Sequence, residues 1–437
     1  MVFTKTRKTA AACATMCAAL VLSCLLSACN QSDANISLPY AAQQTQLTAL
    51  VWAPDWSQQM HEIADAFHRE HPDISVDVQF MIGNSVEENL KPKIATHNLP
   101  DIISINPNAY AAELADQGLL AELGKTSTWD DMRETLKSDW TSPKGRHFGI
   151  SGGVAAPLVY YNREMFRQAG ITKLPTNFEQ FLAVCAALKK AGLTPMAWTG
   201  AFPNLLANGP FSAGFANAVA VRYPNDWKAR IANGTLTLDD AAAVDIFAKM
   251  KRIAERGYLQ RGYMRTGYDE GIRWFAEGRA AMTIQGTWSA GELMHGKGFS
   301  TGIFIPPWNA PHQDTVPVIG SETGFAVCET RNKEAALKFL AFLYGKGFAL
   351  QQNKRQNISP LKQHGDVQIN DPQIVDLVEH AMHAPLTTGP YYSYLPTNTI
   401  DMLHPLLQDV MFNKKTPQQA ALALSRSIHN EARTENK

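Results

Sequence analysis

The sequence has few cysteines, no excess of charge of either sign and only one long hydrophobic run. Its 437 residues carry 40 Lys plus Arg and 40 Asp plus Glu, so the formal net charge is 0. Without a basic patch, a partnership with nucleic acid is not expected, nor is one with phosphate-rich molecules. Of the 6 cysteines, only Cys185 and Cys328 follow residue 29. Both fall in apolar patterns that are typical of small core residues, so we expect no disulfide framework.

The hydrophobic run lies at the N-terminus, behind a positively charged start that consists of Lys5, Arg7 and Lys8. It extends without a charge from Thr9 to Ala28, and residues 26–29 read Leu-Ser-Ala-Cys. This arrangement is typical of a secretory signal with a lipobox, in which small residues precede the cysteine that is acylated. A transmembrane anchor is the alternative, but such an anchor has no use for this ending. We therefore predict a signal peptide over residues 1–28 and lipidation of Cys29, which would anchor the protein on the extracytoplasmic face of the membrane, in the cell envelope.

Strands and helices alternate after a polar tether at residues 29–46. The pattern predicts strands over Leu47–Trp52, Ile74–Phe80 and Asp101–Ile105, with amphipathic helices between or after them. Such an order is typical of a parallel sheet with right-handed crossovers. Because ligands bind at the carboxyl ends of the strands in open α/β sheets, the loops that follow these strands are candidate binding loops.

A second unit begins near Gly149. In it the pattern predicts strands over Val154–Tyr161, Thr194–Thr199 and Ala280–Gln285, and a strand pair or crossover over Val318–Cys328. Helices are predicted around residues 176–191, 239–256, 269–277 and 333–344, with more helix in the tail after Asp371.

Four stretches then point to a known family. They are LPDIISI with AELADQGLLAEL (residues 99–105 and 112–123), YYNREMFRQAGI with LPTNFEQF (160–171 and 174–181), FAEGRAAMTIQGTW (275–288) and KEAALKFLAFLYGK (333–346). In this order and behind a lipobox, they resemble the extracellular solute-binding proteins of carbohydrate importers. The resemblance covers essentially the whole chain after the leader.

The resemblance implies an α/β fold of the two-lobed periplasmic-binding-protein type (type II), with two open sheets and a ligand cleft between the lobes. One lobe would comprise residues 47–149 and 320–358, and the other residues 150–319 and 359–437. The glycine-containing segments Gly149–Gly153 and Val318–Gly320 are candidate hinges. The resemblance also implies no catalysis and no cofactor. The expected partners are a carbohydrate ligand, the membrane subunits of an ABC permease with its cytoplasmic ATPase, and the membrane through the lipid anchor. No nucleic acid is expected, and the protein is expected to be a monomer.

A sugar presents hydroxyls at its edges and an apolar C–H face, so its site needs aromatic rings and polar side chains together. The candidate ligand-binding residues at loops after strands or near the last helices are Trp52, Asp55, Trp56, Asn106, Asn108, Trp198, Trp288, Glu322, Tyr391 and Tyr394. Each has a structural alternative. The aromatic residues suit a core, Asp55 suits a helix N-cap, the asparagines suit a turn, and a loop acid such as Glu322 is usually solvated.

Two other functions stay open. Residues 149–153 read Gly-Ile-Ser-Gly-Gly, which matches the G-x-S-x-G nucleophile elbow of a lipid-anchored serine hydrolase with Ser151 as nucleophile. That motif needs a helix directly after it, whereas a strand is predicted there. The other alternative is a binding protein for a non-sugar solute, either a polyol phosphate or a metal chelate. A phosphate would require Lys or Arg in the binding loops, and none stands out after Trp52, Ile105 or Trp288.

Overall fold

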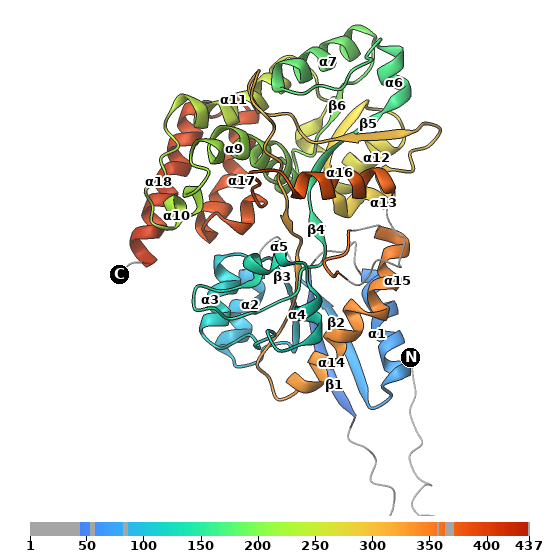
Figure 1. The fold of residues 1–437 in the computed structure, drawn as a ribbon, viewed down its shortest axis with the longest axis vertical. Helices are drawn as coiled ribbons and strands as arrows, with labels where there is room; N and C mark the ends of the chain where they lie inside the picture. Colours follow the sequence, from blue (N-terminus) through green and yellow to red (C-terminus); the bar gives the residue numbers. More distant parts are fainter. Residues whose placement is uncertain (1–43, 53–56, 82–85, 356–357, 363–370, 436–437) are drawn as a thin grey trace, which may run out of the picture. The chain divides into compact units, whose positions relative to one another are not determined.

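A computed structural model describes residues 44–52, 57–81, 86–355, 358–362 and 371–435. Cys29, Asp55 and Trp56 lie outside the described residues, so the predictions made for them are not addressed by the fold. Figure 1 labels the helices and strands along the chain.

The first sheet has the strand order β10-β3-β1-β2. β1 (Thr45–Val51) lies between β2 (Ile74–Phe80) and β3 (Ile102–Ile105) and runs parallel to both. β10 (Gly324–Val327) returns from much later in the chain and pairs antiparallel with β3. The helices α1 (Ser57–Glu70) and α2 (Val86–Ala95) connect the parallel strands, so the predicted parallel unit is confirmed.

One core fills the space between this sheet and its helices. Phe67 on α1 meets Phe339 and Phe342 of α14 (Lys333–Tyr344) edge-on, with ring centroids 5.1 and 5.4 Å apart. Such edge-to-face pairs add to the gain from burying the rings, so the late helix α14 is held firmly against the early helix α1.

The second sheet has the strand order β6-β7-β5-β8. β5 (Pro157–Asn162) pairs antiparallel with both β7 (Met282–Gly286) and β8 (Thr301–Phe304), and β6 (Met196–Ala197) is parallel to β7. Every residue of β5 is buried. Leu158 and Tyr160 belong to the first core and Val159 and Tyr161 to a second core, so this strand is covered on both faces.

Two of the segments that connect the two sheets pair with each other (Figure 1). Val154 and Ala155, which form β4, pair antiparallel with Gly320 and Ser321, which form β9. The N–H of Val154 also donates to the carbonyl of Ile358, 3.1 Å away. The predicted strand over Val154–Tyr161 is therefore divided. Its first two residues pair with another crossover segment, and the rest joins the second sheet.

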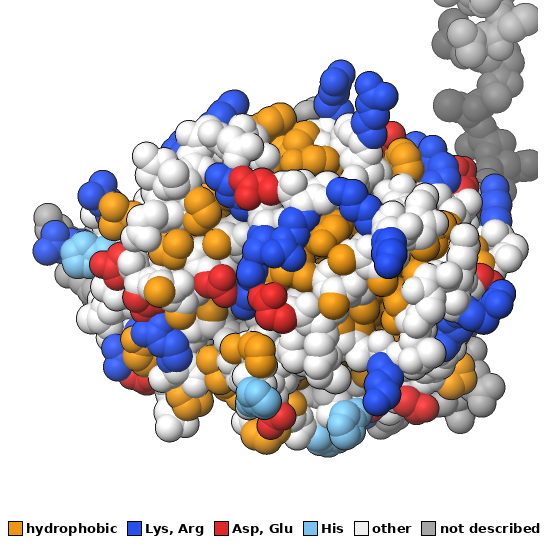
Figure 2. Space-filling model, turned by 90° about the horizontal axis from the view of Figure 1, so that it is seen from above, with side chains coloured by type: hydrophobic (Ala, Val, Ile, Leu, Met, Phe, Trp, Pro, Cys, Tyr) orange, Lys and Arg blue, Asp and Glu red, His pale blue; other side chains and the backbone are white. Residues whose placement is uncertain are grey.

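The remaining helices complete the layers around the sheets. They are α3 (Ala109–Asp116), α4 (Ser127–Asp131), α5 (Glu134–Lys137), α6 (Arg163–Gln168), α7 (Phe178–Lys190), α8 (Pro203–Leu206), α9 (Ser212–Ala218), α10 (Trp227–Ala232), α11 (Ala241–Glu255), α12 (Tyr268–Ala276), α13 (Ala290–Leu293), α15 (Lys346–Arg355), α16 (Pro372–Met382), α17 (Thr397–Met411) and α18 (Pro417–Glu435). Among the described helices, none has both the length and the apolar character that crossing a membrane requires. On the face drawn in Figure 2, basic and acidic side chains are interspersed.

Ser151 does not occupy a nucleophile elbow. It is completely buried, and its Oγ donates a hydrogen bond to the carbonyl of Gly153, 2.7 Å away. The strands β4 and β5 follow it where the elbow needs a helix. The hydrolase alternative therefore has no structural basis.

Candidate functional site

A cavity of about 760 Å³ lies where the crossovers meet, and residues associated with both sheets line it. This volume is in the range of small-molecule sites, which are roughly 300–1,000 Å³. Aromatic side chains form much of the lining: Trp52, Tyr110, Phe202, Tyr268, Trp288, Phe325, Tyr391 and Tyr392. Six of the ten residues predicted from sequence line it, namely Trp52, Asn106, Asn108, Trp288, Glu322 and Tyr391.

The wall on the side of the first sheet (the first wall) consists mainly of residues that follow its strands. Trp52 follows β1, and its backbone N–H donates to the hydroxyl of Ser104 on β3. After β3, Asn106 Oδ1 accepts a hydrogen bond of 2.6 Å from Thr323 Oγ1. Asn108 Oδ1 caps α3 by accepting from the N–H of Ala111, 3.0 Å away. The structural alternative for these asparagines was a turn; the structure shows a helix cap at Asn108, and both asparagines line the cavity.

Tyr110 adds a phenol to the first wall that the sequence analysis did not single out. Its hydroxyl is buried and has no hydrogen-bond partner among the described residues. Burial, with a smaller contribution from the negative charge of Glu87, raises the pKa of Tyr110 to about 12. The phenol is therefore a neutral donor at physiological pH, and a ligand hydroxyl would satisfy it.

The opposite wall (the second wall) holds Trp288 directly after β7. A Cβ built on Gly286 would lie 2.2 Å from the indole ring of Trp288, which is far closer than any real contact. Glycine at the end of this strand therefore gives the indole room to lie across the backbone. The sequence Gly286-Thr287-Trp288 thus positions an aromatic face beside the cavity.

Tyr391 joins three elements of the second wall. Its hydroxyl donates to Asn204 Oδ1 on α8 and lies 2.9 Å from His404 Nε2 on α17. Burial lowers the pKa of His404 to about 4, so its imidazole is neutral at physiological pH. Because the tyrosine proton is used by Asn204, we assign the Nε2 proton of His404 to the bond with Tyr391.

The helix α17 presents one of its faces to the cavity. The lining residues Thr397, Ile400, Asp401 and His404 have the spacing i, i+3, i+4 and i+7, which places them on one side of a helix. Burial raises the pKa of the Asp401 carboxyl, and so do the nearby charges of Glu87 and Glu88. The sequence already contains this helical spacing. It was missed because the candidate residues were chosen mainly in loops that follow strands, and these four residues lie on a helix.

Glu322 is buried, with 4% of its surface exposed, and lines the cavity. The hydroxyl of Thr287, the residue before Trp288, lies 3.4 Å from Glu322 Oε1. Glu322 therefore lies between the crossovers and the second wall, and it is not a solvated loop acid.

Two predicted residues do not line the cavity. Trp198 is 3% exposed in the second core, and its backbone N–H donates to Gln260 Oε1 at 2.9 Å. Tyr394 stacks on Phe215 at 4.7 Å and meets Trp227 edge-on at 5.1 Å. Both side chains are engaged in packing, as their structural alternative describes, so neither is a candidate ligand contact.

The lining is acidic. Its described residues include Glu87, Asp269, Glu322 and Asp401 but no Lys or Arg. The adjoining residues 53–56 and 82–85, which the structure does not describe, contain no basic residue in the sequence either. Within the described part of the chain, no group of three or more His, Cys, Asp or Glu side chains is placed to hold a metal ion. The described lining thus offers aromatic faces and hydrogen-bonding groups, and it includes no Lys or Arg to pair with an anionic ligand.

Comparison with known proteins agrees with the fold. The family described as bacterial extracellular solute-binding protein matches residues 53–349. The chain therefore belongs to this family, whose members bind solutes outside the cytoplasm for transport and are not enzymes.

Curated relatives match over most of the chain. The multiple sugar-binding protein of Streptococcus mutans is 21% identical over 331 residues, which are 74% of this chain and 75% of the relative. The sn-glycerol-3-phosphate-binding periplasmic protein of Escherichia coli is 24% identical over 397 residues, which are 83% and 86% of the two chains.

Solved structures show the same two-lobed α/β fold of type II. The solute-binding protein RafE in complex with raffinose superposes with a TM-score of 0.73 at 19% identity, covering 88% of this chain and 100% of RafE. A sugar transporter protein from Bacillus licheniformis in complex with stachyose gives a TM-score of 0.73 at 16% identity, covering 88% and 99%. The expected fold class is confirmed.

Proposed function

We propose that this protein captures a neutral sugar or short oligosaccharide outside the cytoplasmic membrane and delivers it to an ABC importer. The observation that carries the proposal is a cavity lined by aromatic rings and hydrogen-bonding side chains with no described Lys or Arg. Aromatic faces suit the C–H face of a sugar ring, and amides, carboxylates and phenols suit its hydroxyls. The named ligands of the relatives, sugars in S. mutans and raffinose and stachyose in the solved structures, support the same class.

The capture mechanism that we propose is hinge closure. The two walls are attached to different sheets, and the segments at Gly149–Gly153 and Val318–Gly320 connect those sheets. A ligand that contacts both walls stabilises the arrangement in which they are close, by its differential affinity for that state. The importer would then recognise the closed form.

Of the ten predicted site residues, we keep eight as ligand contacts. Trp52 and Trp288 supply aromatic faces, Asn106, Asn108 and Tyr391 supply hydrogen bonds, and Glu322 accepts from hydroxyls. Asp55 and Trp56 remain proposals that rest on their place after β1 in the sequence.

A polyol phosphate is the second candidate ligand, because the E. coli relative binds sn-glycerol-3-phosphate. The residues that line the cavity of this chain do not favour a polyol phosphate. Phosphate recognition relies on cationic or backbone donors, and the four described carboxylates of the lining would repel a dianion.

The test is a titration monitored by tryptophan fluorescence, because Trp52 and Trp288 line the cavity. A chain that begins at Gln31 keeps every residue that the structure describes. Raffinose, maltotriose, xylotriose and diacetylchitobiose are compared with glycerol 3-phosphate and glucose 6-phosphate. The proposal expects a saturable change with at least one neutral sugar and none with the phosphates. Saturation by a phosphate alone would contradict it.

We also propose that Cys29 anchors the protein to the membrane through its acyl chains. Cells that express the full chain would incorporate a labelled fatty acid into it, and Cys29→Ala would abolish the labelling. Labelling that persists in Cys29→Ala would refute the assignment.

A further inference from the structure

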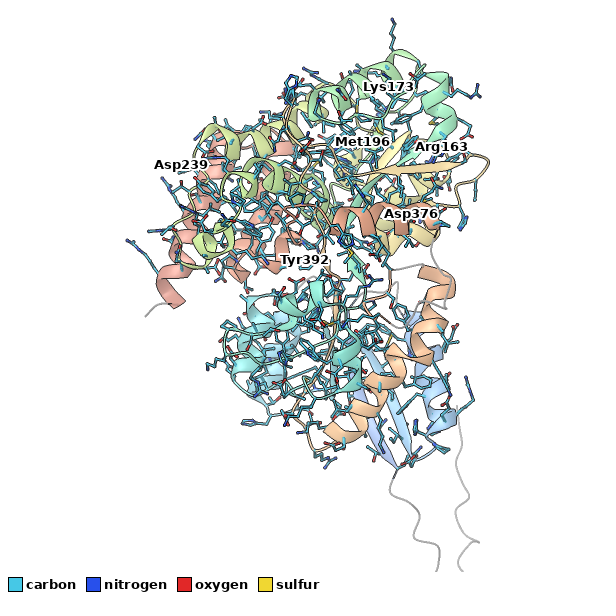
Figure 3. All side chains as sticks on the ribbon, in the orientation of Figure 1. Arg163, Lys173, Met196, Asp239, Asp376 and Tyr392 are labelled. Carbon is cyan, nitrogen blue, oxygen red and sulfur yellow. The ribbon has the colours of Figure 1, made fainter. Side chains whose placement is uncertain are left out.

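The crossover segment Gly320–Thr323 makes direct contacts with both walls of the cavity. The N–H of Ser321 donates to Asp139 Oδ2 at 3.1 Å, and its carbonyl accepts from the hydroxyl of Tyr392 at 2.8 Å. Tyr392 lies on the second wall and is labelled in Figure 3. Two residues later, Thr323 donates to Asn106 on the first wall. A short crossover is thus linked by hydrogen bonds to lining residues from both sheets.

Glu322 lies in the middle of this segment and meets a second crossover. Its N–H donates to the carbonyl of Gly153, 3.1 Å away. A Cβ on Gly153 would lie 3.0 Å from Glu322 Cδ and 3.2 Å from the carbonyl oxygen of Ile358. Because residue 153 is a glycine, the segments that contain Gly153, Glu322 and Ile358 can pack directly against one another.

The carboxylate of Glu322 also reaches the second wall through Thr287. The Thr287 hydroxyl lies 2.7 Å from the carbonyl of Val154 and 3.4 Å from Glu322 Oε1, and it accepts from the N–H of Ala156 at 3.2 Å. It has one proton to donate, so it can donate to the crossover backbone or to Glu322. The next residue is Trp288, which lines the cavity.

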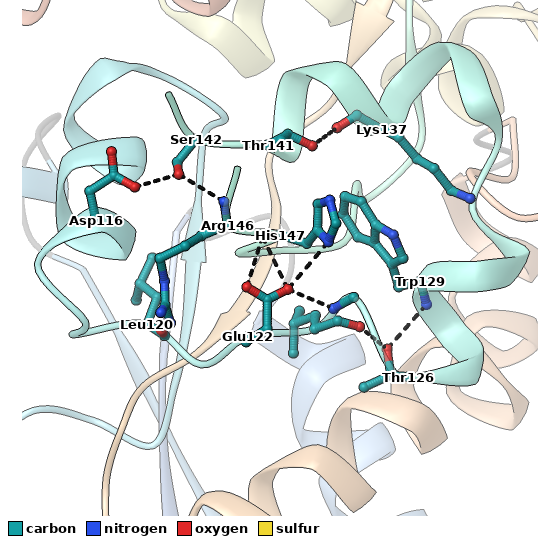
Figure 4. Close-up of polar contacts among 12 residues, drawn as sticks. Asp116, Leu120, Glu122, Thr126, Trp129, Lys137, Thr141, Ser142, Arg146 and His147 are labelled. Atoms are coloured by element: carbon teal, nitrogen blue, oxygen red, sulfur yellow. Dashed lines mark hydrogen bonds and ion pairs between the residues drawn. The ribbon is translucent and has the colours of Figure 1, made fainter. Parts of the chain in front are cut away.

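On the side of the first sheet, Ser321 is bonded to Asp139 of the 3-10 turn Ser138–Trp140, and Figure 4 shows the polar contacts of the residues that follow this turn. Ser142 bonds to Asp116, Thr141 donates to the carbonyl of Lys137 at 2.8 Å, and Arg146 donates to the carbonyl of Leu120 at 3.0 Å. The bond from Thr141 to Lys137 spans the turn that carries Asp139. Burial raises the pKa of the Asp139 carboxyl, while the N–H of Ser321 that it accepts acts in the opposite direction.

We propose that Glu322 is a positioning residue that couples occupancy of the cavity to bending at the crossovers. A ligand that stacks on Trp288 moves Thr287, and a ligand that bonds to Asn106 moves Thr323, and both of these residues adjoin Glu322. The inference rests on the proposed hinge closure. It assigns to Glu322 an effect on the open–closed equilibrium that exists before any ligand binds.

The experiment measures the distance between two dyes in the chain that begins at Gln31. Cysteines are introduced by Lys125→Cys and Lys173→Cys, at exposed positions on the two lobes; Lys173 is labelled in Figure 3. Cys185 and Cys328 are buried, and burial raises the pKa of both thiols, so they do not react with the dye. The single-molecule distance distribution is recorded without ligand and with raffinose.

Glu322→Gln keeps the size of the side chain and removes its charge. Hydrogen bonds to charged groups are stronger than neutral ones by about 1 kcal/mol, so the ratio of the open to the closed population without ligand should change by about fivefold. Thr287→Val removes the shared hydroxyl and should change the same ratio. Glu329→Gln removes an exposed carboxylate that pairs with Lys333 at 3.1 Å, and it should leave the ratio unchanged.

A ligand-free distribution that neither Glu322→Gln nor Thr287→Val changes would overturn the proposal, even if the affinity for raffinose falls, because Glu322 would then only contact the ligand. A changed ligand-free distribution supports the coupling whether or not raffinose binds. Absence of binding to every neutral sugar would instead count against the proposed function.

Discussion

The two walls of the cavity are built in different ways. On the first wall, Trp52, Asn106 and Asn108 follow strands of a parallel sheet, where the backbone geometry brings successive loops to one edge. On the second wall, most lining residues lie on helices, above all on the face of α17 that carries Thr397 and His404. Sequence reasoning from strand ends therefore finds the first wall and only the part of the second that follows β7.

The polar groups of the two walls are also held in place in different ways. The first wall presents asparagines that hydrogen bonds already fix in place, Asn108 to the backbone of α3 and Asn106 to the side chain of Thr323. The second wall presents Tyr391 and His404, whose hydroxyl and imidazole are ordered by each other and by burial. Substitutions on the second wall should therefore change the pH dependence of folding stability and the stacking of the sugar. Substitutions on the first wall should change folding stability and sugar affinity together.

The largest expected effect is a loss of folding stability at acid pH, and it arises from His404 on the second wall. The pKa of His404 is lowered from 6.5 to about 4, so the unfolded chain takes up the proton first as the pH falls. The stability that depends on neutral His404 is complete above pH 6.5 and is lost between pH 6.5 and 4, by up to about 3 kcal/mol. In His404→Gln this acid-dependent loss should disappear. Urea unfolding of both proteins at pH 7 and 4.5 measures the difference, and equal losses would contradict the account.

The next effect is on ligand stacking. Trp288→Ala should weaken sugar binding by about 1–3 kcal/mol with little loss of fold, because an aromatic face is removed from the cavity. Titration calorimetry uses the neutral sugar that binds best in the fluorescence panel. The matched control is Trp274→Ala, which removes an indole outside the cavity that packs on Arg279. Equal losses of affinity in the two variants would remove Trp288 from the site.

A smaller effect separates capping from binding on the first wall. Asn108 caps α3 and Asn177 caps α7, with side-chain acceptor distances of 3.0 Å in both. Replacing either by Ala should cost about 1 kcal/mol of folding stability. Only Asn108→Ala should also weaken sugar binding, because only Asn108 lines the cavity. If Asn108→Ala binds the sugar with unchanged affinity, Asn108 only caps α3 and does not contact the ligand.

The smallest effect on binding is expected at Trp198. Trp198→Phe removes part of a buried side chain and should lower the melting temperature while the affinity for the sugar stays the same. A clear loss of affinity would show that the ligand site extends beyond the cavity to Trp198.

The strands of the first sheet could be predicted well because each is a local pattern. The predicted strand over Ile74–Phe80 coincides with β2, and the crossover at Val318–Cys328 contains β9 and β10. The strand predicted over Thr194–Thr199 was too long, because only Met196 and Ala197 pair with β7, while Trp198 bonds to the side chain of Gln260.

The lining was harder to predict than the fold, because burial of an aromatic depends on distant partners. Tyr391 and Tyr394 are three residues apart and look alike in the sequence. Tyr391 reaches Asn204 and His404 at the cavity, whereas Tyr394 stacks on Phe215 in the core. The side chains that decide between these two environments lie far away in the chain, and no local pattern carries that information.

The most direct test of the central claim, that this cavity holds a neutral sugar, is thermal unfolding of the chain that begins at Gln31 with and without candidate ligands. A ligand that binds only the folded state stabilises it by about 2.7 kcal/mol when present at a hundredfold excess over its Kd. A neutral oligosaccharide should raise the melting temperature, whereas glycerol 3-phosphate and glucose 6-phosphate should leave it unchanged. A rise with the phosphates and none with any neutral sugar would contradict it.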